Sequence, residues 1–327
     1  MFTLVTGAAG FIGYHVATAL LQRGNRVIGI DNLCDYYDVG LKRARLAQLS
    51  RFTGFDFAEI DIADREAVEA LIDRYPDFDT IVHFAAQAGV RYSLTNPYTY
   101  VKSNVMGQVV ILEAARRLPR LRHLVYASSS SVYGANATLP FAVTDRVDHP
   151  ISLYASTKRA GELIVHTYSH LWGLPATGLR FFTVYGPWGR PDMAAYLFAD
   201  AIVAGRPIRV FNQGQMQRDF TYIDDIVAGV LVAADRPPAP DATGVRHALY
   251  NLGNHRAENL MDFVSALETA FGRKVLLAFE PMQPGDVPAT FADIEPARRD
   301  LGFEPKTSIA AGIPKFVAWY KDYHGVT

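Results

Sequence analysis

Short apolar runs alternate with longer segments of helical periodicity along the first part of the chain, up to about residue 180. The apolar runs favour strands buried on both faces, and the longer segments, at about 11–23, 64–74, 97–117 and 152–172, favour helices. This alternation is typical of a doubly wound parallel sheet covered by helices. The predicted strands are Phe2–Thr6, Arg26–Ile30, Phe55–Glu59, Thr80–Phe84, His123–Ala127 and Ala176–Arg180.

The pattern changes after about residue 181, where proline and glycine become frequent and the segments shorten. Helical periodicity continues at about 193–204, 224–234, 258–271 and 308–323. The 327 residues exceed the roughly 250–300 at which one core stops growing. We therefore expect a larger lobe, residues 1–180 plus a return segment at about 218–252, and a smaller lobe made of about 181–217 and 253–327.

Glycines stand between the first predicted strand and the first predicted helix, in Gly7-Ala-Ala-Gly10-Phe-Ile-Gly13. Glycine lets backbone N–H groups approach a diphosphate at a helix N-terminus, where the helix dipole favours negative charge. The spacing differs by one residue from the usual dinucleotide fingerprint. A tight turn without a ligand is the alternative, but the position between strand and helix favours a Rossmann-type dinucleotide site.

Asp31 stands eighteen residues past Gly13, at the end of the second predicted strand. A carboxylate in this position would accept both ribose hydroxyls of adenosine and repel a 2′-phosphate, so NAD is favoured over NADP. The alternative is that Asp31 and the adjacent Asn32 cap the following loop.

The segment Tyr154-Ala-Ser-Thr-Lys158 lies within the predicted helix at 152–172. Residues four apart share a helix face, so the ammonium can stabilise a tyrosinate. A tyrosinate is a base that can take a proton from an alcohol while its carbon loses hydride. Free tyrosine has a pKa of about 10, which Lys158 and a positive nicotinamide would have to lower to about 7. A solvated pair without this role is the alternative.

Bulk properties exclude several classes of function. The formal net charge of −1 gives no basic excess for nucleic acid. Cys34 is the only cysteine, which excludes an internal disulfide and a cysteine-rich metal site and favours a reducing compartment. No run of about 18 apolar residues predicts a membrane span, and the N-terminal segment lacks the pattern of a signal peptide. We expect a cytoplasmic protein without a metal, nucleic-acid or membrane partner.

Several motifs together resemble those of the extended short-chain dehydrogenases/reductases, and specifically of NAD-dependent nucleotide-sugar epimerases. The matching pieces, which span nearly the whole chain, are Gly7–Gly13, Asp31-Asn32, Asp61-Ile62, His83–Arg91, Asn104, Ser128–Gly134, Tyr154–Lys158 and Arg218–Ile226. The resemblance implies that Asp61 and Ile62 flank the adenine and that Lys158 also holds the nicotinamide ribose. The cofactor-binding residues it implies are Gly7, Gly10, Phe11, Ile12, Gly13, Asp31, Asn32, Asp61, Ile62, Ala85, Ala86, Gln87, Asn104, Tyr154 and Lys158.

The serine run Ser128–Ser131 supplies a third catalytic group in this resemblance. Alignment on the following Val132-Tyr133-Gly134 places Ser129 in the family's Ser/Thr position, with Ser130 as second choice. A turn or helix cap is the alternative for a serine run at a strand end. Related dehydratases carry an acidic pair directly after the catalytic Ser/Thr, where this chain has Ser130-Ser131. Hydroxyls do not replace a general acid and base at neutral pH, so epimerisation is favoured over dehydration.

The stretch from Arg180 to Met193 resembles UDP-glucuronate 4-epimerases, as do Ala88–Ser93 and Pro281–Val287. An arginine fork can bind a carboxylate through two hydrogen bonds, and a threonine adds a neutral donor. The hypothesis is that Thr183 and Arg190 hold the sugar carboxylate out of line with the 4-keto group and so prevent loss of CO₂. A solvated arginine or an ion pair between lobes is the alternative for Arg190.

The nucleotide end of the substrate site is also implied by resemblance. Arg218 corresponds to the arginine that meets the diphosphate, and Asp286 to the carboxylate on the uridine ribose. The segment Ile208–Phe211, with Val210 and Phe211, would hold uracil through backbone groups. Gln283 stands where some relatives have a second basic residue, a difference for which Arg91 or Arg256 could compensate.

The sequence therefore predicts NAD-dependent 4-epimerisation of UDP-glucuronate through a transient 4-keto sugar. Tyr154 is the expected base, Lys158 its electrostatic partner and Ser129 the hydroxyl relay; the expected substrate contacts are Arg91, Ser129, Ser130, Thr183, Arg190, Val210, Phe211, Arg218 and Asp286. The alternatives are a UDP-glucuronate decarboxylase, a UDP-glucose/UDP-galactose 4-epimerase, and a regulatory protein that binds NAD(H) without turnover. A homodimer is expected by resemblance.

Overall fold

The structure is a computed structural model that describes residues 1–283 and 285–326. Pro284, within the Pro281–Val287 stretch, and Thr327 lie outside the described residues.

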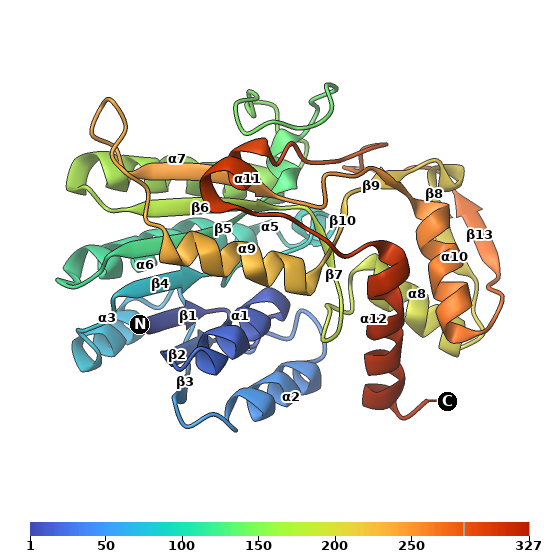
Figure 1. Ribbon diagram of the computed structural model, residues 1–327, viewed down its shortest axis with the longest axis horizontal. Helices are drawn as coiled ribbons and strands as arrows, with labels where there is room; N and C mark the ends of the chain where they lie inside the picture. Colours follow the sequence, from blue (N-terminus) through green and yellow to red (C-terminus); the bar gives the residue numbers. More distant parts are fainter. Residues whose placement is uncertain (284, 327) are drawn as a thin grey trace.

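Across these residues the larger lobe is built on a seven-stranded sheet in the order β11-β6-β5-β4-β1-β2-β3 (Figure 1). Every neighbouring pair in it is parallel, as the apolar runs predict. The strand order reverses between β1 and β4, which opens a crevice at the carboxyl ends of these strands. The strands are β1 (Phe2–Thr6), β2 (Arg26–Asp31), β3 (Phe55–Glu59), β4 (Thr80–His83), β5 (His123–Ser129), β6 (Ala176–Phe181) and β11 (His247–Leu252).

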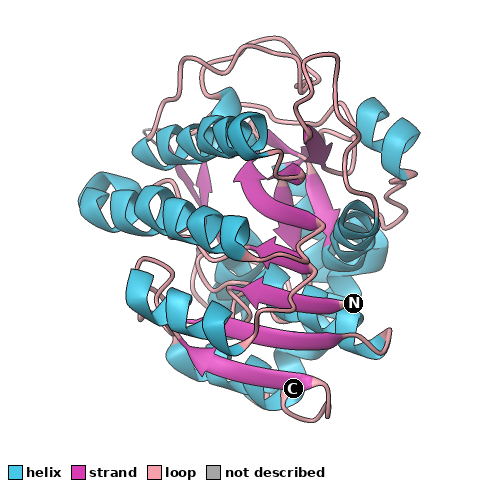
Figure 2. Cartoon of the chain, turned by 90° about the vertical axis from the view of Figure 1, so that its left-hand side faces the viewer, coloured by secondary structure: helices cyan, strands magenta, loops and turns pink. Residues whose placement is uncertain are grey.

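Helices cover both faces of this sheet (Figure 2). Leu4 and Val5, successive residues of β1, belong to different apolar clusters because neighbouring side chains on a strand point to opposite faces. The doubly wound α/β fold is thereby confirmed. The helices of this lobe are α1 (Phe11–Gln22), α2 (Val39–Leu49), α3 (Arg65–Arg74), α4 (Tyr92–Thr95), α5 (Pro97–Tyr100), α6 (Gly107–Arg117), α7 (Leu153–Trp172), α9 (Ile223–Asp235), α11 (Glu295–Leu301) and the short 3₁₀ segment η2 (Ser130–Tyr133).

Several helical segments differ from the expectation, among them α4 and α11, which were not predicted. The predicted helix at 97–117 is interrupted by a π-helical turn, η1 (Val101–Met106), between α5 and α6. Helix α2 was not predicted; it begins after Asp38, whose side chain accepts a hydrogen bond from the N–H of Gly40. An aspartate that accepts from the first turn is a common helix start.

The smaller lobe combines three two-stranded sheets with three helices. Its elements are β7 (Thr183–Tyr185) paired with β10 (Phe220–Tyr222), β8 (Ile208–Phe211) with β13 (Leu277–Glu280), β9 (Gln217–Arg218) with β12 (Glu258–Asn259), the 3₁₀ segment η3 (Asn212–Gly214), and helices α8 (Ala194–Val203), α10 (Leu260–Phe271) and α12 (Ile309–His324). The four helices predicted after residue 190 are α8, α9, α10 and α12. The chain returns to the large sheet at β11, which pairs with β6.

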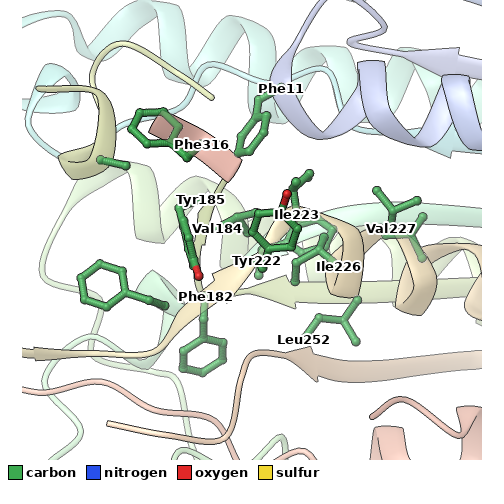
Figure 3. Packing of buried hydrophobic residues seen from close by; sticks show 14 of the residues in the cluster. Phe11, Phe182, Val184, Tyr185, Tyr222, Ile223, Ile226, Val227, Leu252 and Phe316 are labelled. Atoms are coloured by element: carbon green, nitrogen blue, oxygen red, sulfur yellow. The ribbon is translucent and has the colours of Figure 1, made fainter. Parts of the chain in front are cut away.

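The two lobes share one apolar core. Figure 3 shows Phe11 of α1, Val184 and Tyr185 of β7, Ile226 of α9 and Phe316 of α12 in the same region, and all of them belong to one buried cluster. Close packing across this region fixes how the lobes face each other. The exact domain boundaries given above stay a prediction.

Candidate active site

A cavity of about 1050 Å³ runs from the carboxyl ends of β1 and β4 to the smaller lobe. Its wall includes the glycine turn, the serine run, the Tyr154–Lys158 segment and side chains of the smaller lobe. The switch point of a doubly wound sheet is the usual position of a ligand site.

The glycine turn needs glycine for steric reasons. Gly7 has a φ of +72°, and a Cβ there would lie 2.7 Å from the backbone nitrogen of Ala85. A Cβ on Gly13 would lie 2.1 Å from the carbonyl oxygen of Gly7. Gly10 is the N-cap of α1 and offers no side-chain acceptor, so the turn can present its N–H groups to a ligand. Gly7, Gly10, Phe11, Ile12 and Gly13 all line the cavity, and this geometry fits a dinucleotide diphosphate.

Asp31 and Asn32 also line the cavity, at the end of β2. Asp31 accepts from the N–H of Leu33 (2.9 Å) and of Ala9 (3.2 Å), and Asn32 accepts from the N–H of Cys34 (3.1 Å). Burial raises the pKa of Asp31, while the ammonium of Lys42, 4.0 Å away, opposes this effect. Asp31 and Asn32 thus cap the following loop, as the alternative interpretation expected. The carboxylate of Asp31 also faces the cavity.

The predicted adenine residues Asp61 and Ile62 line the same end of the cavity. The carboxylate of Asp61 is paired with Lys102 at 2.8 Å. Ala85, Ala86 and Gln87 line the wall that follows β4.

The three predicted catalytic residues converge on the middle of the cavity. Tyr154 and Lys158 lie one turn apart on α7, and Ser129 is the last residue of β5. The Ser129 hydroxyl donates to Oγ of Ser131 at 3.1 Å and lies near enough to Tyr154 to influence its pKa, and Ser130 lines the wall beside them. The ammonium of Lys158 donates to the carbonyl of Ala127 at 3.0 Å.

Burial governs the protonation of this group. It lowers the pKa of Lys158 to about 8, with Glu162 opposing the shift. Burial also raises the pKa of Tyr154, while the hydroxyl of Ser129 and the charge of Arg190 act to lower it. The protein groups alone therefore do not lower the pKa of Tyr154, and its lowering by Lys158 together with the nicotinamide stays a prediction. Desolvation penalises the phenolate more than the neighbouring groups stabilise it.

Two predicted site residues lie behind the cavity wall. Asn104, on the π-helical turn, is buried and bonds the N–H (2.8 Å) and carbonyl (3.0 Å) of Gln87 and the hydroxyl of Thr157 (3.0 Å). Asn104 therefore holds Gln87, which lines the cavity, against α7, but does not itself line the cavity. Val210 has its side chain in the core because alternation along β8 turns Arg209 and Phe211 away from the core.

At the sugar end, Thr183 and Arg190 line the cavity. The guanidinium of Arg190 donates through Nε (3.0 Å) and Nη2 (2.6 Å) to the two carboxylate oxygens of Asp192. Tyr36, from the loop after β2, donates to the same carboxylate at 2.9 Å. Arg190 is therefore in an ion pair within its own loop, which is not the ion pair between lobes that the alternative expected.

At the far end, Arg91, Phe211, Arg218 and Asp286 line the cavity together. Arg91 pairs with Asp286 at 3.2 Å and lies over the ring of Phe211 at 4.7 Å. Arg218 donates to the carbonyls of Gln217 and Pro288. Residues predicted from three distant parts of the sequence thus meet at one end of the cavity.

Several cavity residues were missed by the sequence reasoning. Lys42 is only 4% exposed and lies beside Asp31; its position on a helix directly after the Asp31 loop was an available signal. Asp192, only two residues from Arg190, could have been recognised as its partner. Tyr36 and Lys102 gave no comparable signal, because their contacts are set by the tertiary fold.

Among residues 1–283 and 285–326, no group of three or more His, Cys, Asp or Glu side chains could hold a metal ion. Within the same residues, no helix combines the length and apolar character that a membrane span requires.

Comparison with known proteins gives a consistent assignment. The model of the NAD dependent epimerase/dehydratase family matches residues 3–253. A probable UDP-glucuronate 4-epimerase of Rhizobium meliloti is 46% identical over 329 residues, with 97% of this chain and 96% of the relative covered. UDP-glucuronate 4-epimerase 4 of Arabidopsis thaliana is 48% identical over 98% of this chain and 75% of the relative.

A solved structure agrees with these relatives. The UDP-glucuronic acid 4-epimerase of Bacillus cereus, in complex with UDP-glucuronic acid and NAD, superposes with a TM-score of 0.89 at 33% identity. The superposition covers 99% of this chain and 100% of that one. The resemblance inferred from the motifs is confirmed, and the chain belongs to the NAD-dependent epimerase/dehydratase family.

Proposed function

We propose that this protein is an NAD-dependent isomerase that interconverts UDP-glucuronate and UDP-galacturonate by inversion at C4. The observation that carries the proposal is the convergence of Tyr154, Lys158 and Ser129 in one cavity with the glycine turn. The relatives named as UDP-glucuronate 4-epimerases, nearly half identical over almost the whole chain, support the choice of sugar.

NAD is the cofactor, and the glycine turn and Asp31 are placed to hold its diphosphate and adenosine ribose. When bound, it would supply the acceptor for hydride from C4 and the donor for the return of that hydride. Tyr154 would take and return the proton of the C4 hydroxyl, and Ser129, in the same cavity, would orient that hydroxyl. Lys158 contributes positive charge beside the reaction.

The arrangement of Arg190 refines the hypothesis about the sugar carboxylate. Two of its donors already meet Asp192, so the sugar carboxylate would share the arginine with Asp192 or replace it. Thr183 and Ser130, on the same wall, would add neutral donors. Restraint of the carboxylate by these groups would keep the C5–carboxylate bond out of line with the 4-keto group and preserve the six-carbon product.

The deciding experiment is incubation of the purified protein with UDP-glucuronate and analysis of the product by mass spectrometry and NMR. Unchanged mass with inversion at C4 is the expected result. Loss of CO₂ would identify a decarboxylase, and preferential turnover of UDP-glucose an epimerase for neutral sugars. Binding of NAD without conversion of any UDP-sugar would leave the regulatory alternative.

The proposal includes a homodimer. Tyr98, Val101 and Met106 on α5 and η1, and Leu163 on α7, are exposed apolar side chains, and Tyr98 is 85% exposed. Helix α7 packs against both η1 and α6, so these side chains belong to adjacent elements whose outer surface could pair with a second copy. Light scattering should give twice the monomer mass, and Met106→Glu combined with Leu163→Glu should give the monomer.

The lone cysteine fits action in the cytoplasm.

A further inference from the structure

Arg45, on α2, is fully buried, although arginine is among the residues least often buried. Its four hydrogen bonds in the described part of the chain all go to neutral oxygens. Nη1 donates to the carbonyl of Ala9 (2.8 Å) and the hydroxyl of Tyr37 (2.8 Å), and Nη2 donates to the carbonyls of Trp188 (2.7 Å) and Gly189 (3.1 Å). Its buried Nε has no partner. A buried charge that is hydrogen-bonded only to neutral oxygens is costly, which points to a role beyond packing.

The two backbone segments that Arg45 joins lie at different parts of the site, one at the proposed cofactor end and the other at the sugar end. Ala9 lies inside the glycine turn, between Gly7 and Gly10. Trp188 and Gly189 directly precede Arg190, the residue at the sugar end of the cavity. One guanidinium group therefore connects the turn suited to a diphosphate with the loop that carries Arg190.

The loop depends on such support, because Trp188 has a φ of +60°, which is unfavourable for a residue with a side chain. Its ring lies 5.5 Å from Tyr14 of α1 and 5.4 Å from Trp319 of α12. The carbonyl of Pro187 lies 2.9 Å from Nε2 of His15. These contacts hold the loop against its neighbours, whereas Arg45 alone hydrogen-bonds both the loop and the glycine turn.

We propose that Arg45 is a positioning residue that couples the glycine turn to the Arg190 loop, so that NAD binding and recognition of the sugar carboxylate depend on each other. Movement of the turn would displace the Trp188 and Gly189 carbonyls, and with them Arg190. This inference rests on the proposed function.

The test compares Arg45→Met, Arg45→Lys and the control Arg43→Met, which makes the same change at an exposed position of the same helix. For each purified protein, five quantities are measured: bound NAD per chain, affinity for UDP, affinity for UDP-glucuronate in excess NAD, KM and kcat. UDP reports on the Arg218 end of the cavity and so controls for a general loss of folding.

Arg45→Met should retain less NAD, bind UDP within about twofold of the wild type, and show a KM for UDP-glucuronate raised at least tenfold, with more decarboxylated product. Arg45→Lys keeps the charge but not the two-pronged guanidinium group, so it should retain more NAD and show a lower KM than Arg45→Met. Arg43→Met should match the wild type. Unchanged NAD retention and KM in Arg45→Met would overturn the proposal, as would an equal loss of UDP and UDP-glucuronate affinity. A wild-type protein that does not convert UDP-glucuronate would refute the proposed function instead. In that case NAD retention in Arg45→Met still tests whether Arg45 supports the glycine turn.

Discussion

Tyr154 is subject to opposing demands. A buried phenol keeps its proton more tightly, yet the proposed reaction needs it as a base. The hydroxyl of Ser129 and the charge of Arg190 act in the required direction but do not outweigh burial. The positive nicotinamide expected beside Tyr154 would supply the remaining stabilisation of the phenolate. Tyr154 is therefore expected to become a base only when NAD is present.

Replacement of Tyr154 by Phe removes the proposed base and keeps the ring. We expect kcat to fall by about 10²–10⁴-fold, because the phenolic hydroxyl that is lost transfers the proton in the reaction. NAD content and UDP-glucuronate affinity should be nearly unchanged. Steady-state kinetics with binding titrations measure both quantities. Tyr168→Phe removes a hydroxyl from the same helix, where it meets Glu113, and should retain wild-type kcat. A Tyr154→Phe enzyme with normal kcat would exclude Tyr154 as the base.

Replacement of Arg190 by Ala should weaken UDP-glucuronate binding by roughly tenfold, the value of one charge-assisted hydrogen bond. The fraction of product that has lost CO₂ should rise, because the carboxylate is less restrained. Mass spectrometry of the product mixture measures that fraction. Arg120→Ala, which removes an exposed arginine paired with Asp77 outside the cavity, is the matched control. Unchanged affinity and product ratio would mean that Arg190 serves only as the partner of Asp192.

The secondary structure was largely predictable where local patterns determine it. Six strands of the large sheet were predicted with ends within two residues of those found, whereas the seventh, β11, was not predicted as a strand. The glycine turn was recognisable because its glycines stand between a predicted strand and a predicted helix, although the clash that requires glycine at Gly7 is with the distant Ala85. The π-helical turn η1 was not, because it depends on contacts distant in sequence, including Ile62 against Gly107 and Asn104 against Gln87 and Thr157.

The same distinction applies to the site. The residue types at the reaction centre could be read from the motifs, but the partners of their charged groups could not. The sequence suggested a free fork on Arg190, and the fold provides Asp192 and Tyr36 beside it. Arg45 gave no signal in the sequence, since its function depends on two segments that only the tertiary structure brings together.

The π-helical turn supports a further prediction, because it places Asn104 between Gln87 and α7. Asn104→Ala would leave the buried N–H and carbonyl of Gln87 without these partners, and should reduce the free energy of unfolding by about 1–3 kcal/mol. Urea denaturation measures this change. Asn136→Ala, at an exposed loop asparagine with one hydrogen bond to the carbonyl of Arg146, should cost much less. Equal losses in the two variants would argue against a supporting role for Asn104.

The whole molecule carries histidines that burial keeps neutral. Burial lowers the pKa of His15, His123 and His247 to about 4 and that of His83 to about 3. The unfolded chain, with a histidine pKa of about 6.5, binds these protons first, so the stabilising contribution is present above pH 6.5 and is lost as the pH falls towards 4. Asp219 acts in the opposite direction, because burial raises its pKa to about 6. Burial also raises the pKa of Asp31, and with four histidines against these two carboxyl groups we expect lower stability in acid.

Urea unfolding at pH 7 and pH 5 should therefore show a smaller free energy of unfolding at pH 5, with each histidine contributing at most about 1.4 kcal/mol per pH unit. His123→Gln should reduce this pH dependence, whereas His170→Gln, at an exposed position on α7, should not. Equal pH dependence in the wild type and His123→Gln would contradict the assignment.

The packing of Trp319 and Tyr323 of α12 against Trp188 has a consequence for how the protein is made. The ribosome synthesises the Arg190 loop long before it synthesises α12, and β11 of the large sheet also follows that loop in the chain. A nascent chain can therefore contain every residue of the reaction centre and still lack the aromatic surface on which the sugar end rests. Catalytic competence should be acquired late in synthesis, when the last helix docks.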